Sequence, residues 1–407
     1  MARYDYNLAV IGGGSAGLIA GLIAATVKAK VVLIERDRMG GDCLNTGCVP
    51  SKSLIRAARA AQEMRSAERF GIRSVEPEVD FAAVMARVKS VIATIEPKDS
   101  VERYESLGVE CIVGDATLED GHNIRVATAA GERKVSARSI VLATGAEPFV
   151  PPIPGLRELE PLTSDNVWEL KERPERLLVM GGGPIGCELA QSFARLGSKV
   201  TLIDMEERLL PREDPETSEL LRARFEAEGV DVRLGHRATA VTGREAGSRG
   251  GVLTAELAGA DGATETVAID FDDILVAVGR AARRGSGLEA AGVALNPNGT
   301  IAVDDYLRST SLPSVFACGD AVGPYQFTHM ASHQAWYAAV NGLFGRFKKF
   351  KVNYSIVPWA TYTEPEVARV GLSEAEAKAA GIPHEVVRYD LDDLDRALAE
   401  GAPEGWV

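Results

Sequence analysis

The chain has 407 residues, 46% of them hydrophobic and 25% charged, and its formal net charge is −13. This length exceeds what one hydrophobic core supports, so two or three domains are expected in an ordinary globular protein. The acidic balance argues against nucleic acid or an anionic membrane surface as the main partner.

Targeting and cysteine usage point to the cytoplasm. The apolar pattern begins directly after the first few residues, so no signal peptide is expected. The longest apolar stretch, residues 18–27, is too short to span a bilayer. The 5 cysteines are odd in number and mostly far apart, which is not typical of a secreted disulfide framework.

The stretch 8–35 carries the full pattern of a dinucleotide-binding fold. A short apolar run leads into a GGGSAG motif, an apolar helical stretch follows, and a second apolar run ends at an acidic residue. The first glycine makes the tight turn, the second lets the backbone approach a pyrophosphate, and the third lets the helix pack on the strand. The helix N-terminus binds phosphate, and the acid accepts from a ribose hydroxyl. The residues at these positions are Gly12, Gly14, Ser15, Gly17 and Glu35.

The stretch 40–52 contains two cysteines, Cys43 and Cys48. An unbroken helix would hold Cα atoms five residues apart at about 8.6 Å, whereas a disulfide needs roughly 4.4 to 6.8 Å. The segment must therefore be distorted, and Gly47 supplies the backbone freedom. If regular helix begins just after Cys48, Lys52 falls on the same face, where a cation favours the thiolate. This pattern is typical of a redox switch.

Other interpretations of the two cysteines exist. A zinc site would need two further ligands at matching spacing, and none stands near, so no metal site is expected. A structural disulfide is not expected in a chain with cytosolic features. From this stretch alone, two unrelated buried cysteines remain an alternative.

A predicted helix and a proline-rich linker between domains follow. Residues 81–107 carry apolar positions at helical spacing, so we expect one long helix packed on the first domain. Residues 147–155 form the densest proline cluster, which marks the passage into a second domain.

The dinucleotide pattern then occurs a second time, with GGGPIG at residues 181–186 and Asp204 in the place of the acid. In both copies the acid follows the first glycine by the same number of residues, and a similar apolar strand ending in glycine closes each copy. Two fingerprints with identical spacing predict two dinucleotide-binding domains.

The last part of the chain contributes a further carboxylate. An apolar strand ends at Gly319-Asp320, and a helix begins near Thr328. We expect this carboxylate to reach a cofactor hydroxyl, and the helix N-terminus to stabilise negative charge on a reduced flavin. A new β-rich pattern begins near residue 352.

The chain closely resembles the class I pyridine nucleotide-disulfide oxidoreductases, which include dihydrolipoamide dehydrogenases, glutathione reductases and mercuric reductases. Its most specific element is the GG-x-C-x-x-x-x-C-x-P-x-K run at 40–52. The resemblance implies an α/β fold with two Rossmann-like domains, for FAD and NAD(P), and an incomplete α+β interface domain. The implied divisions are 1–149 with 280–347 for FAD, 150–279 for NAD(P), and 348–407 for the start of the dimerisation domain.

The resemblance also implies roles for the site residues. Cys48 would be the thiolate against the flavin, Cys43 the interchange thiol, and Lys52 would pair with Glu188 beside the reactive flavin nitrogen. A buried lysine needs such a partner, although a plain surface salt bridge is the alternative for Glu188. The implied FAD-binding residues are Gly12, Gly14, Ser15, Gly17, Glu35, Lys52, Thr144, Gly145, Asp320 and His329, with Arg280 in the cofactor clefts. The implied nicotinamide-binding residues are Gly181, Gly183, Ile185, Gly186, Asp204 and Gly279.

The expected reaction passes electrons from NAD(P)H through FAD and the Cys43–Cys48 disulfide to a small-molecule or protein-bound disulfide, or in reverse. Asp204 favours a free 2′-hydroxyl, and the next three residues offer no positive charge, which predicts NAD(H) over NADP(H). A dihydrolipoamide dehydrogenase-like enzyme is expected. The alternatives are a mercuric reductase-like metal-ion reductase, and an FAD- and NADH-binding diaphorase or redox-sensing partner without disulfide turnover. Leu22 stands where glutathione reductases place an arginine, which disfavours glutathione.

The family pattern breaks near the end of the chain. Family members deliver a His-Glu pair from the end of the dimerisation domain into the partner subunit, and this sequence stops about halfway through that domain. His384-Glu385 has the right letters but lies in a loop entering a strand, so it is not expected to be that pair. We expect residues to be missing after Val407, and a homodimer where that domain is complete.

Overall fold

The computed structural model describes residues 4–244, 250–258 and 264–407. The chain divides into two compact units, each assembled from three separate stretches. The first unit comprises Met1–Pro50, Ser90–Glu147 and Arg280–Ser355. The second unit comprises Ser51–Lys89, Pro148–Gly279 and Ile356–Val407. Each unit is built around a sheet of its own.

A seven-stranded sheet forms the centre of the first unit, in the order β3-β2-β1-β6-β5-β4, with β16 beside β6. Its strands are β1 (Tyr6–Ile11), β2 (Val31–Glu35), β3 (Val109–Val113), β4 (Asp115–Leu118), β5 (Asn123–Thr128), β6 (Gly131–Leu142) and β16 (Val315–Ala317). The pairings among β3, β2, β1, β6 and β16 are parallel, whereas β4 and β5 are antiparallel. The first part of β6 pairs with β5 and its last part with β1 and β16, so one strand joins both halves of the sheet.

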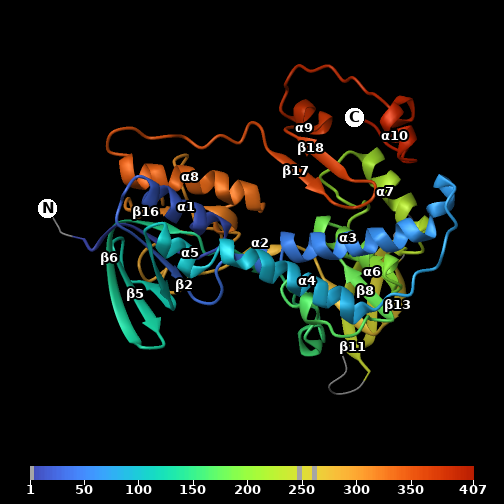
Figure 1. Cartoon of the computed structure of the whole chain (residues 1–407), viewed down its shortest axis with the longest axis horizontal. Helices are drawn as coiled ribbons and strands as arrows, with labels where there is room; N and C mark the ends of the chain where they lie inside the picture. Colours follow the sequence, from blue (N-terminus) through green and yellow to red (C-terminus); the bar gives the residue numbers. More distant parts are fainter. Residues whose placement is uncertain (1–3, 245–249, 259–263) are drawn as a thin grey trace. The chain divides into compact units, whose positions relative to one another are not determined.

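Both faces of the parallel part are covered, which explains why β1 and β2 are nearly continuous apolar runs. Leu8 and Val10 pack in a cluster with helices α1 (Ser15–Thr26) and α8 (Thr328–Phe344), which lie against each other (Figure 1). Ala9, one position along β1, belongs to a second cluster, as the alternation of side chains in a strand requires. Two shorter helices of this unit are α2 (Gly41–Asn45) and α5 (Val101–Ser106).

The second unit has a four-stranded parallel sheet in the order β10-β9-β8-β14 and an antiparallel sheet, β11-β12-β13. Its strands are β8 (Arg176–Met180), β9 (Lys199–Ile203), β10 (Asp231–Arg233), β11 (His236–Gly243), β12 (Gly251–Ala258), β13 (Thr264–Phe271) and β14 (Asp273–Val276), followed by the hairpin β17 (Pro358–Thr361) and β18 (Val367–Val370). Two further short strands, β7 (Ala146–Pro148) and β15 (Arg280–Ala282), pair with each other and, apart from Pro148, belong to the first unit.

The helices of the second unit include α3, which starts in the first unit, and α4, which ends in the first unit. They are α3 (Cys48–Arg65), α4 (Phe81–Ile95), α6 (Pro184–Arg195), α7 (Pro215–Ala227), α9 (Glu374–Ala379) and α10 (Asp395–Ala399). Of the helices that the structure describes, none combines the length and apolar character needed to cross a membrane. The β8-α6-β9 unit repeats the β1-α1-β2 arrangement, which confirms the predicted α/β class with two dinucleotide-binding sheets.

The single long helix predicted over 81–107 is wrong. The helix α4 ends at Ile95, a 3₁₀ turn occupies Glu96–Lys98, and α5 starts afresh with Ser100 as its N-cap. A proline in the 3₁₀ turn and a serine that caps the next helix explain the break. The start of α4 also packs within the second unit rather than on the first domain, because the rings of Phe81 and Phe193 lie 6.0 Å apart.

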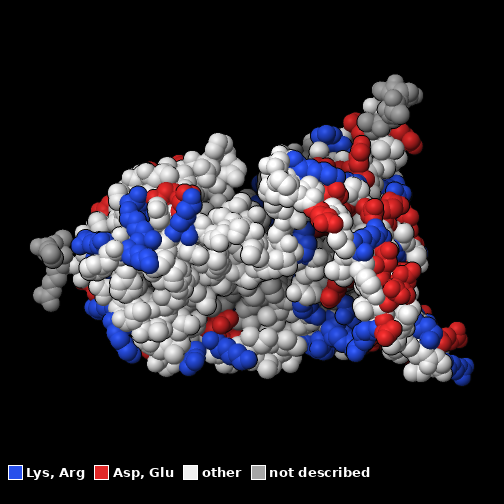
Figure 2. Space-filling model, turned by 90° about the horizontal axis from the view of Figure 1, so that it is seen from above, with Lys and Arg blue, Asp and Glu red and all other residues white. Residues whose placement is uncertain are grey.

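The surface of the second unit carries charges of both signs. Figure 2 shows its acidic and basic side chains interspersed rather than gathered by sign. Some of them form ion pairs, such as Arg222–Glu226 within α7 and Arg388–Glu216. Exposed pairs of this kind contribute little to stability.

Candidate functional site

The first glycine-rich turn connects β1 to α1 and leaves no room for side chains. Gly12 has φ +106°, and a Cβ there would lie 2.3 Å from the carbonyl oxygen of Ala143. A Cβ on Gly17 would lie 1.8 Å from the carbonyl oxygen of Gly12. Helix α1 begins after Gly14 with no side-chain cap among the described residues, so its first N–H groups face outward for a ligand. These features fit the pyrophosphate of a dinucleotide.

Glu35 ends β2 and points back at this turn. Its Oε2 accepts a hydrogen bond from the Gly13 N–H at 2.6 Å, and its Oε1 accepts from the Asp37 N–H at 2.9 Å. The carboxylate is therefore fixed at the strand end, where the ribose of a dinucleotide lies in this fold.

The cysteine stretch packs directly on this turn. The Gly40 N–H donates to the Gly13 carbonyl at 2.9 Å, and a Cβ on Gly41 would lie 2.5 Å from the Gly14 Cα. Gly40 and Gly41 have φ of +89° and +55°, a conformation that favours glycine. The glycine pair at the start of the stretch thus brings the cysteines to the first fingerprint.

Cys43 lies in α2 and Cys48 begins α3, and neither is part of a disulfide in this structure. The hydrogen bond from Cys43 to Cys48 and the burial of Cys43 raise the pKa of the Cys43 thiol. The pair therefore favours negative charge on Cys48 over Cys43. Cys48 Sγ lies 3.3 Å from the Thr328 hydroxyl, at the start of α8, and Cys43 also contacts Ser15 and Thr328.

The predicted distortion between the cysteines exists, but its cause differs from the expectation. Gly47 does not adopt the left-handed conformation; it is needed because a Cβ there would lie 2.8 Å from the carbonyl oxygen of Asp42. Helix α3 also starts at Cys48 itself, one residue earlier than expected.

Asp320 lies in a 3₁₀ turn directly after β16, in the same unit as the cysteines. Burial raises its pKa to about 6, although Arg280, 3.7 Å away, opposes the rise. Arg280 also binds the Asp42 carboxylate and donates to the Ala146 carbonyl at 2.9 Å. Asp42 was missed by the sequence analysis, since an acidic residue between two glycines and a cysteine gives no signal for a distant arginine.

Of the remaining FAD candidates, Thr144, Gly145 and His329 lie in the first unit, whereas Lys52 lies in the second. Thr144 donates to the Arg283 carbonyl at 3.2 Å, and Gly145 has φ +71°. His329 is in the first turn of α8 and stacks on Phe327 with ring centroids 5.5 Å apart. The structure thus collects Gly12, Gly14, Ser15, Gly17, Glu35, Cys43, Cys48, Thr144, Gly145, Asp320 and His329 in one unit.

The second glycine-rich turn repeats the first. Gly181 has φ +114° with its Cβ position 2.4 Å from the Ala277 carbonyl oxygen, and a Cβ on Gly186 would lie 1.8 Å from the Gly181 carbonyl oxygen. Asp204 accepts from the Gly182 N–H with one carboxylate oxygen and from the Glu206 N–H at 2.9 Å with the other. The remaining predicted residues of this site are Gly183, which caps α6, half-buried Ile185, and Gly279 with φ +126°.

Lys52 and Glu188 form the predicted ion pair, and both residues lie in the second unit. Lys52 Nζ lies 2.8 Å from Glu188 Oε2, and Glu188 is buried in α6 while its Oε1 accepts from the Tyr362 N–H at 2.9 Å. The ammonium group also lies 4.4 Å from the centroid of the Tyr362 ring. Tyr362 was missed, because an aromatic residue at the end of a short strand is not distinguishable from ordinary packing.

The other candidates give no further site. His384 lies in an irregular exposed segment, and its Nδ1 is 2.7 Å from the carbonyl oxygen of Ile382. Within the described ranges, no three or more His, Cys, Asp or Glu side chains are grouped so that they could hold a metal ion.

Comparisons with known proteins agree with this geometry. Residues 6–335 match the family model described as pyridine nucleotide-disulphide oxidoreductase, and residues 357–407 match the dimerisation domain of that family. The chain is 38% identical over 410 residues to a mercuric reductase of Streptomyces lividans, which covers 100% of this chain and 84% of that protein. It is 33% identical over 408 residues to a dihydrolipoyl dehydrogenase of Chlamydia muridarum, covering 99% and 83%.

A solved structure is also similar over nearly the whole chain. It is the HOCl-induced flavoprotein disulfide reductase RclA of Escherichia coli, with 28% identity and a TM-score of 0.83, covering 98% of this chain and 85% of that one. The chain therefore belongs to the pyridine nucleotide-disulfide oxidoreductases, flavoprotein enzymes that bind FAD and a pyridine nucleotide and use NAD(P)H.

Proposed function

We propose that Cys43 and Cys48 are the redox-active pair of an NAD(P)H-dependent disulfide or dithiol oxidoreductase. The observation that carries this proposal is that the two cysteines lie beside the first glycine-rich turn, against which Gly40 and Gly41 pack, and interact with each other there. The raised pKa of Cys43 supports the assignment of the first thiolate to Cys48.

The exchange chemistry follows from two adjacent thiols. The Cys43 sulfur attacks a substrate disulfide and forms a mixed disulfide, and the proton of the Cys43 thiol leaves with the first substrate thiol. The Cys48 thiolate then attacks the Cys43 sulfur, releases the second substrate thiol and closes the Cys43–Cys48 disulfide. Two electrons and two protons restore the dithiol, and with a dithiol substrate the same steps run in reverse.

When bound, FAD would supply the two-electron link between NAD(P)H and this disulfide. Support for its site comes from the uncapped start of α1, the fixed Glu35 carboxylate and the buried Asp320 carboxylate. The proposed FAD domain comprises 1–149 and 280–347, and the proposed nucleotide domain 150–279. Lys52, ion-paired to Glu188, is proposed to place a positive charge at the redox centre.

NADH is the proposed nucleotide. Asp204 is oriented by two main-chain N–H groups, so its carboxylate can accept from a free ribose 2′-hydroxyl and would repel a 2′-phosphate. The residues that follow it, Met205, Glu206 and Glu207, offer no compensating positive charge.

The redox pair is tested by spectroscopy of the purified flavoprotein without oxygen. NADH should produce the long-wavelength absorbance of a thiolate beside an oxidised flavin, and Cys48→Ala should lack it and lose disulfide turnover. Cys43→Ala should show the absorbance without NADH, because Cys48 then has no disulfide partner. Wild-type turnover by Cys48→Ala would refute the proposal, and reduction of artificial dyes without disulfide turnover by the wild type would indicate a diaphorase.

The proposed substrate is a dihydrolipoamide-like dithiol or disulfide, and a mercuric ion is the second candidate. The second candidate is favoured by the 38% identity to a protein named mercuric reductase, and the first by the 33% identity to a dihydrolipoyl dehydrogenase. Measured turnover of lipoamide and of mercuric ion held by excess thiol separates them. If only the mercuric ion supports NADH oxidation, the first candidate is wrong.

A homodimer is the proposed assembly. Its support is the match of residues 357–407 to the dimerisation domain of the family. Sedimentation equilibrium on the purified chain checks this, and a concentration-independent monomer mass would contradict it.

A further inference from the structure

Three side chains on one face of α6 bind the same short segment after β17. Glu188, Gln191 and Arg195 recur at spacings of three and four residues, which places them on one side of the helix. Glu188 accepts from the Tyr362 N–H at 2.9 Å. Gln191 accepts from the Glu364 N–H at 2.9 Å and donates to the Glu364 carbonyl at 2.8 Å, so its amide pairs with both main-chain groups of that residue.

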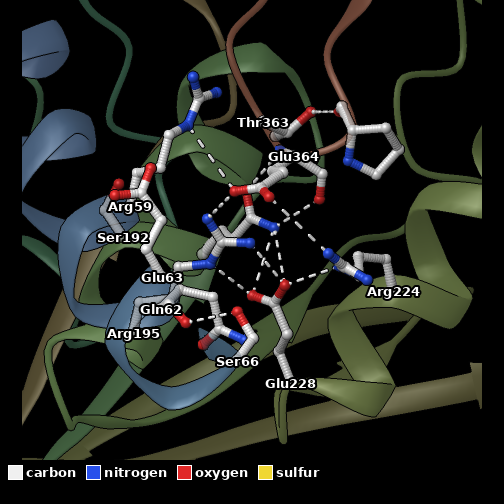
Figure 3. Close-up of polar contacts among 12 residues, drawn as sticks. Arg59, Gln62, Glu63, Ser66, Ser192, Arg195, Arg224, Glu228, Thr363 and Glu364 are labelled. Atoms are coloured by element: carbon white, nitrogen blue, oxygen red, sulfur yellow. Dashed lines mark hydrogen bonds and ion pairs between the residues drawn. The ribbon is translucent and has the colours of Figure 1, made fainter. Parts of the chain in front are cut away.

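Arg195 binds the side chain of the same residue. Its Nη1 donates to Glu364 Oε2 at 2.6 Å, while its other nitrogens donate to both oxygens of Glu228, at 2.7 and 2.6 Å (Figure 3). Arg195 and Glu228 have side chains only 4% and 7% exposed, so water does not compete for these bonds. Arg224, at the end of α7, adds a further bond to Glu228 at 2.8 Å.

Glu364 is surrounded by positive charge. Burial alone would raise its pKa, but Arg195, Arg59 and Arg224 outweigh burial and lower the pKa of this carboxyl. Figure 3 shows Arg195 directed at Glu364 and the Nε of Arg59 facing the same carboxylate from another helix. The segment 362–364 is thus held by main-chain and side-chain bonds at once.

These bonds to segment 362–364 also affect Tyr362, at its first position, and through Tyr362 they affect Lys52. Lys52 Nζ lies between two partners: the Glu188 carboxylate at 2.8 Å and the Tyr362 ring at 4.4 Å. The Lys52 side chain is 36% exposed, so the ion pair alone would leave the ammonium free to move into solvent. A ring held at this distance attracts the cation and restricts it to one side of the carboxylate.

We propose that Tyr362 is a positioning residue for Lys52, and that Gln191, Glu364 and Arg195 hold Tyr362 in place. The proposal rests on the proposed function, in which the Lys52 cation serves the redox centre. The Tyr362 N–H orients the Glu188 carboxylate, and the Tyr362 ring fixes the ammonium against it. The charge of Lys52 then stays at a constant position while electrons pass.

The test compares purified flavoproteins carrying Tyr362→Leu, Tyr362→Phe, Gln191→Leu and Lys52→Met, with Tyr389→Leu as a control in the same unit. The readouts are the midpoint potential of the bound flavin, its rate of reduction by NADH, and hydrogen exchange of the Tyr362 amide. Tyr362→Leu should reduce the rate about threefold to tenfold, the effect of one lost cation–π contact, and shift the potential in the same direction as Lys52→Met. Tyr362→Phe keeps the ring and should recover most of the lost rate.

Gln191→Leu should accelerate exchange of the Tyr362 amide and shift the potential in the same direction, while Tyr389→Leu should change neither. A ring with only a packing role would alter the melting temperature but not the potential. The proposal is overturned if Tyr362→Leu has the wild-type potential, or if Phe and Leu at this position are equally impaired. If Lys52→Met leaves the potential unchanged, the proposed role of Lys52 is wrong, and the Tyr362 proposal fails with it. If Lys52→Met shifts the potential and Tyr362→Leu does not, only the Tyr362 proposal fails.

Discussion

The two glycine-rich turns, one in each unit, have nearly the same backbone and different neighbours. Gly12 and Gly181 have φ of +106° and +114°, and a Cβ on Gly17 or Gly186 would lie 1.8 Å from a carbonyl oxygen in both cases. In each turn an acidic side chain from the end of the next strand accepts from the N–H of the middle glycine. The backbone requirements of dinucleotide binding are therefore met twice, by separate stretches of chain.

What packs against each turn is not the same. In the first unit the turn lies against Gly41, and Ser15 at the start of α1 contacts the Cys43 thiol. In the second unit the corresponding helix, α6, carries Glu188 and its ion pair with Lys52. The glycine-rich turn is thus common to both units, whereas the residues that pack around it differ between them, and function depends on such site residues rather than on the fold.

The largest effect on nucleotide binding is expected from a matched pair of substitutions, one in each turn: Gly17→Ala and Gly186→Ala. Each new Cβ would collide with a carbonyl oxygen, and forcing extra atoms into such a site costs up to about 3 kcal/mol, or roughly a hundredfold in binding. Gly17→Ala should release FAD and yield colourless protein. Gly186→Ala should stay yellow and lose its response to NADH, as measured by absorbance titration.

Two controls keep this result interpretable. Gly71→Ala and Gly108→Ala replace glycines that, unlike Gly17 and Gly186, have positive φ, and no described atom lies within 4 Å of either new Cβ. Both should keep FAD and NADH binding close to wild type. If Gly186→Ala released FAD as readily as Gly17→Ala, the assignment of one nucleotide to each turn would be wrong.

The fingerprints were predictable because their requirements are local. A tight turn needs glycine, and a strand end needs an acid at a fixed spacing, so Gly12, Glu35, Gly181 and Asp204 could be recognised in the sequence. The Lys52–Glu188 pair was predictable only from the resemblance, since the two residues are separated by more than a hundred positions.

Tyr362 and the Arg195 cluster were not predictable, for a related physical reason. Their contacts join α3, α6, α7 and the hairpin end, and no periodicity within one element indicates which arginine meets which carboxylate. The break between α4 and α5 was missed for the opposite reason, because helical spacing of apolar residues continued through a proline and a capping serine that end the helix locally. The missed contacts of Tyr362 and Arg195 are thus due to long-range pairing, whereas the missed helix break is due to local residues that end a helix.

A second test contrasts carboxylates whose pKa values shift in opposite directions, Asp320 in the first unit and Asp272 in the second. Burial raises the pKa of Asp320 from 3.8 to about 6, so the folded state binds its proton more tightly and stability falls as pH rises from about 4 to 6. Asp320→Asn removes this cost. In the apoprotein it should be more stable than wild type at pH 8, by about 3 kcal/mol, and equal to it below pH 4.

The pKa of Asp272 shifts in the opposite direction. The hydrogen bonds from Arg176 lower its pKa, so its contribution is present above pH 3.8 and lost as pH falls through the lowered value. Asp272→Asn should therefore be less stable than wild type at pH 8, by about 0.5 kcal/mol for a partly exposed pair. Urea midpoints across pH measure both. Parallel pH curves for wild type and Asp320→Asn would contradict the assigned shift.

A further expected effect concerns the acids at the two strand ends. Asp204→Asn keeps the shape of the side chain and one hydrogen-bond acceptor, but it removes the charge that discriminates against a 2′-phosphate. The ratio of kcat/KM for NADH to kcat/KM for NADPH should therefore fall about tenfold, which corresponds to the loss of one charged hydrogen bond. Glu35→Gln makes the same change in the first unit and should weaken FAD binding while leaving that ratio unchanged. A ratio that fell in Glu35→Gln instead would mean that the two turns exchange their nucleotides. A ratio unchanged in both variants would move the source of nucleotide choice away from the strand ends, to side chains that contact the 2′ position from elsewhere in the second unit.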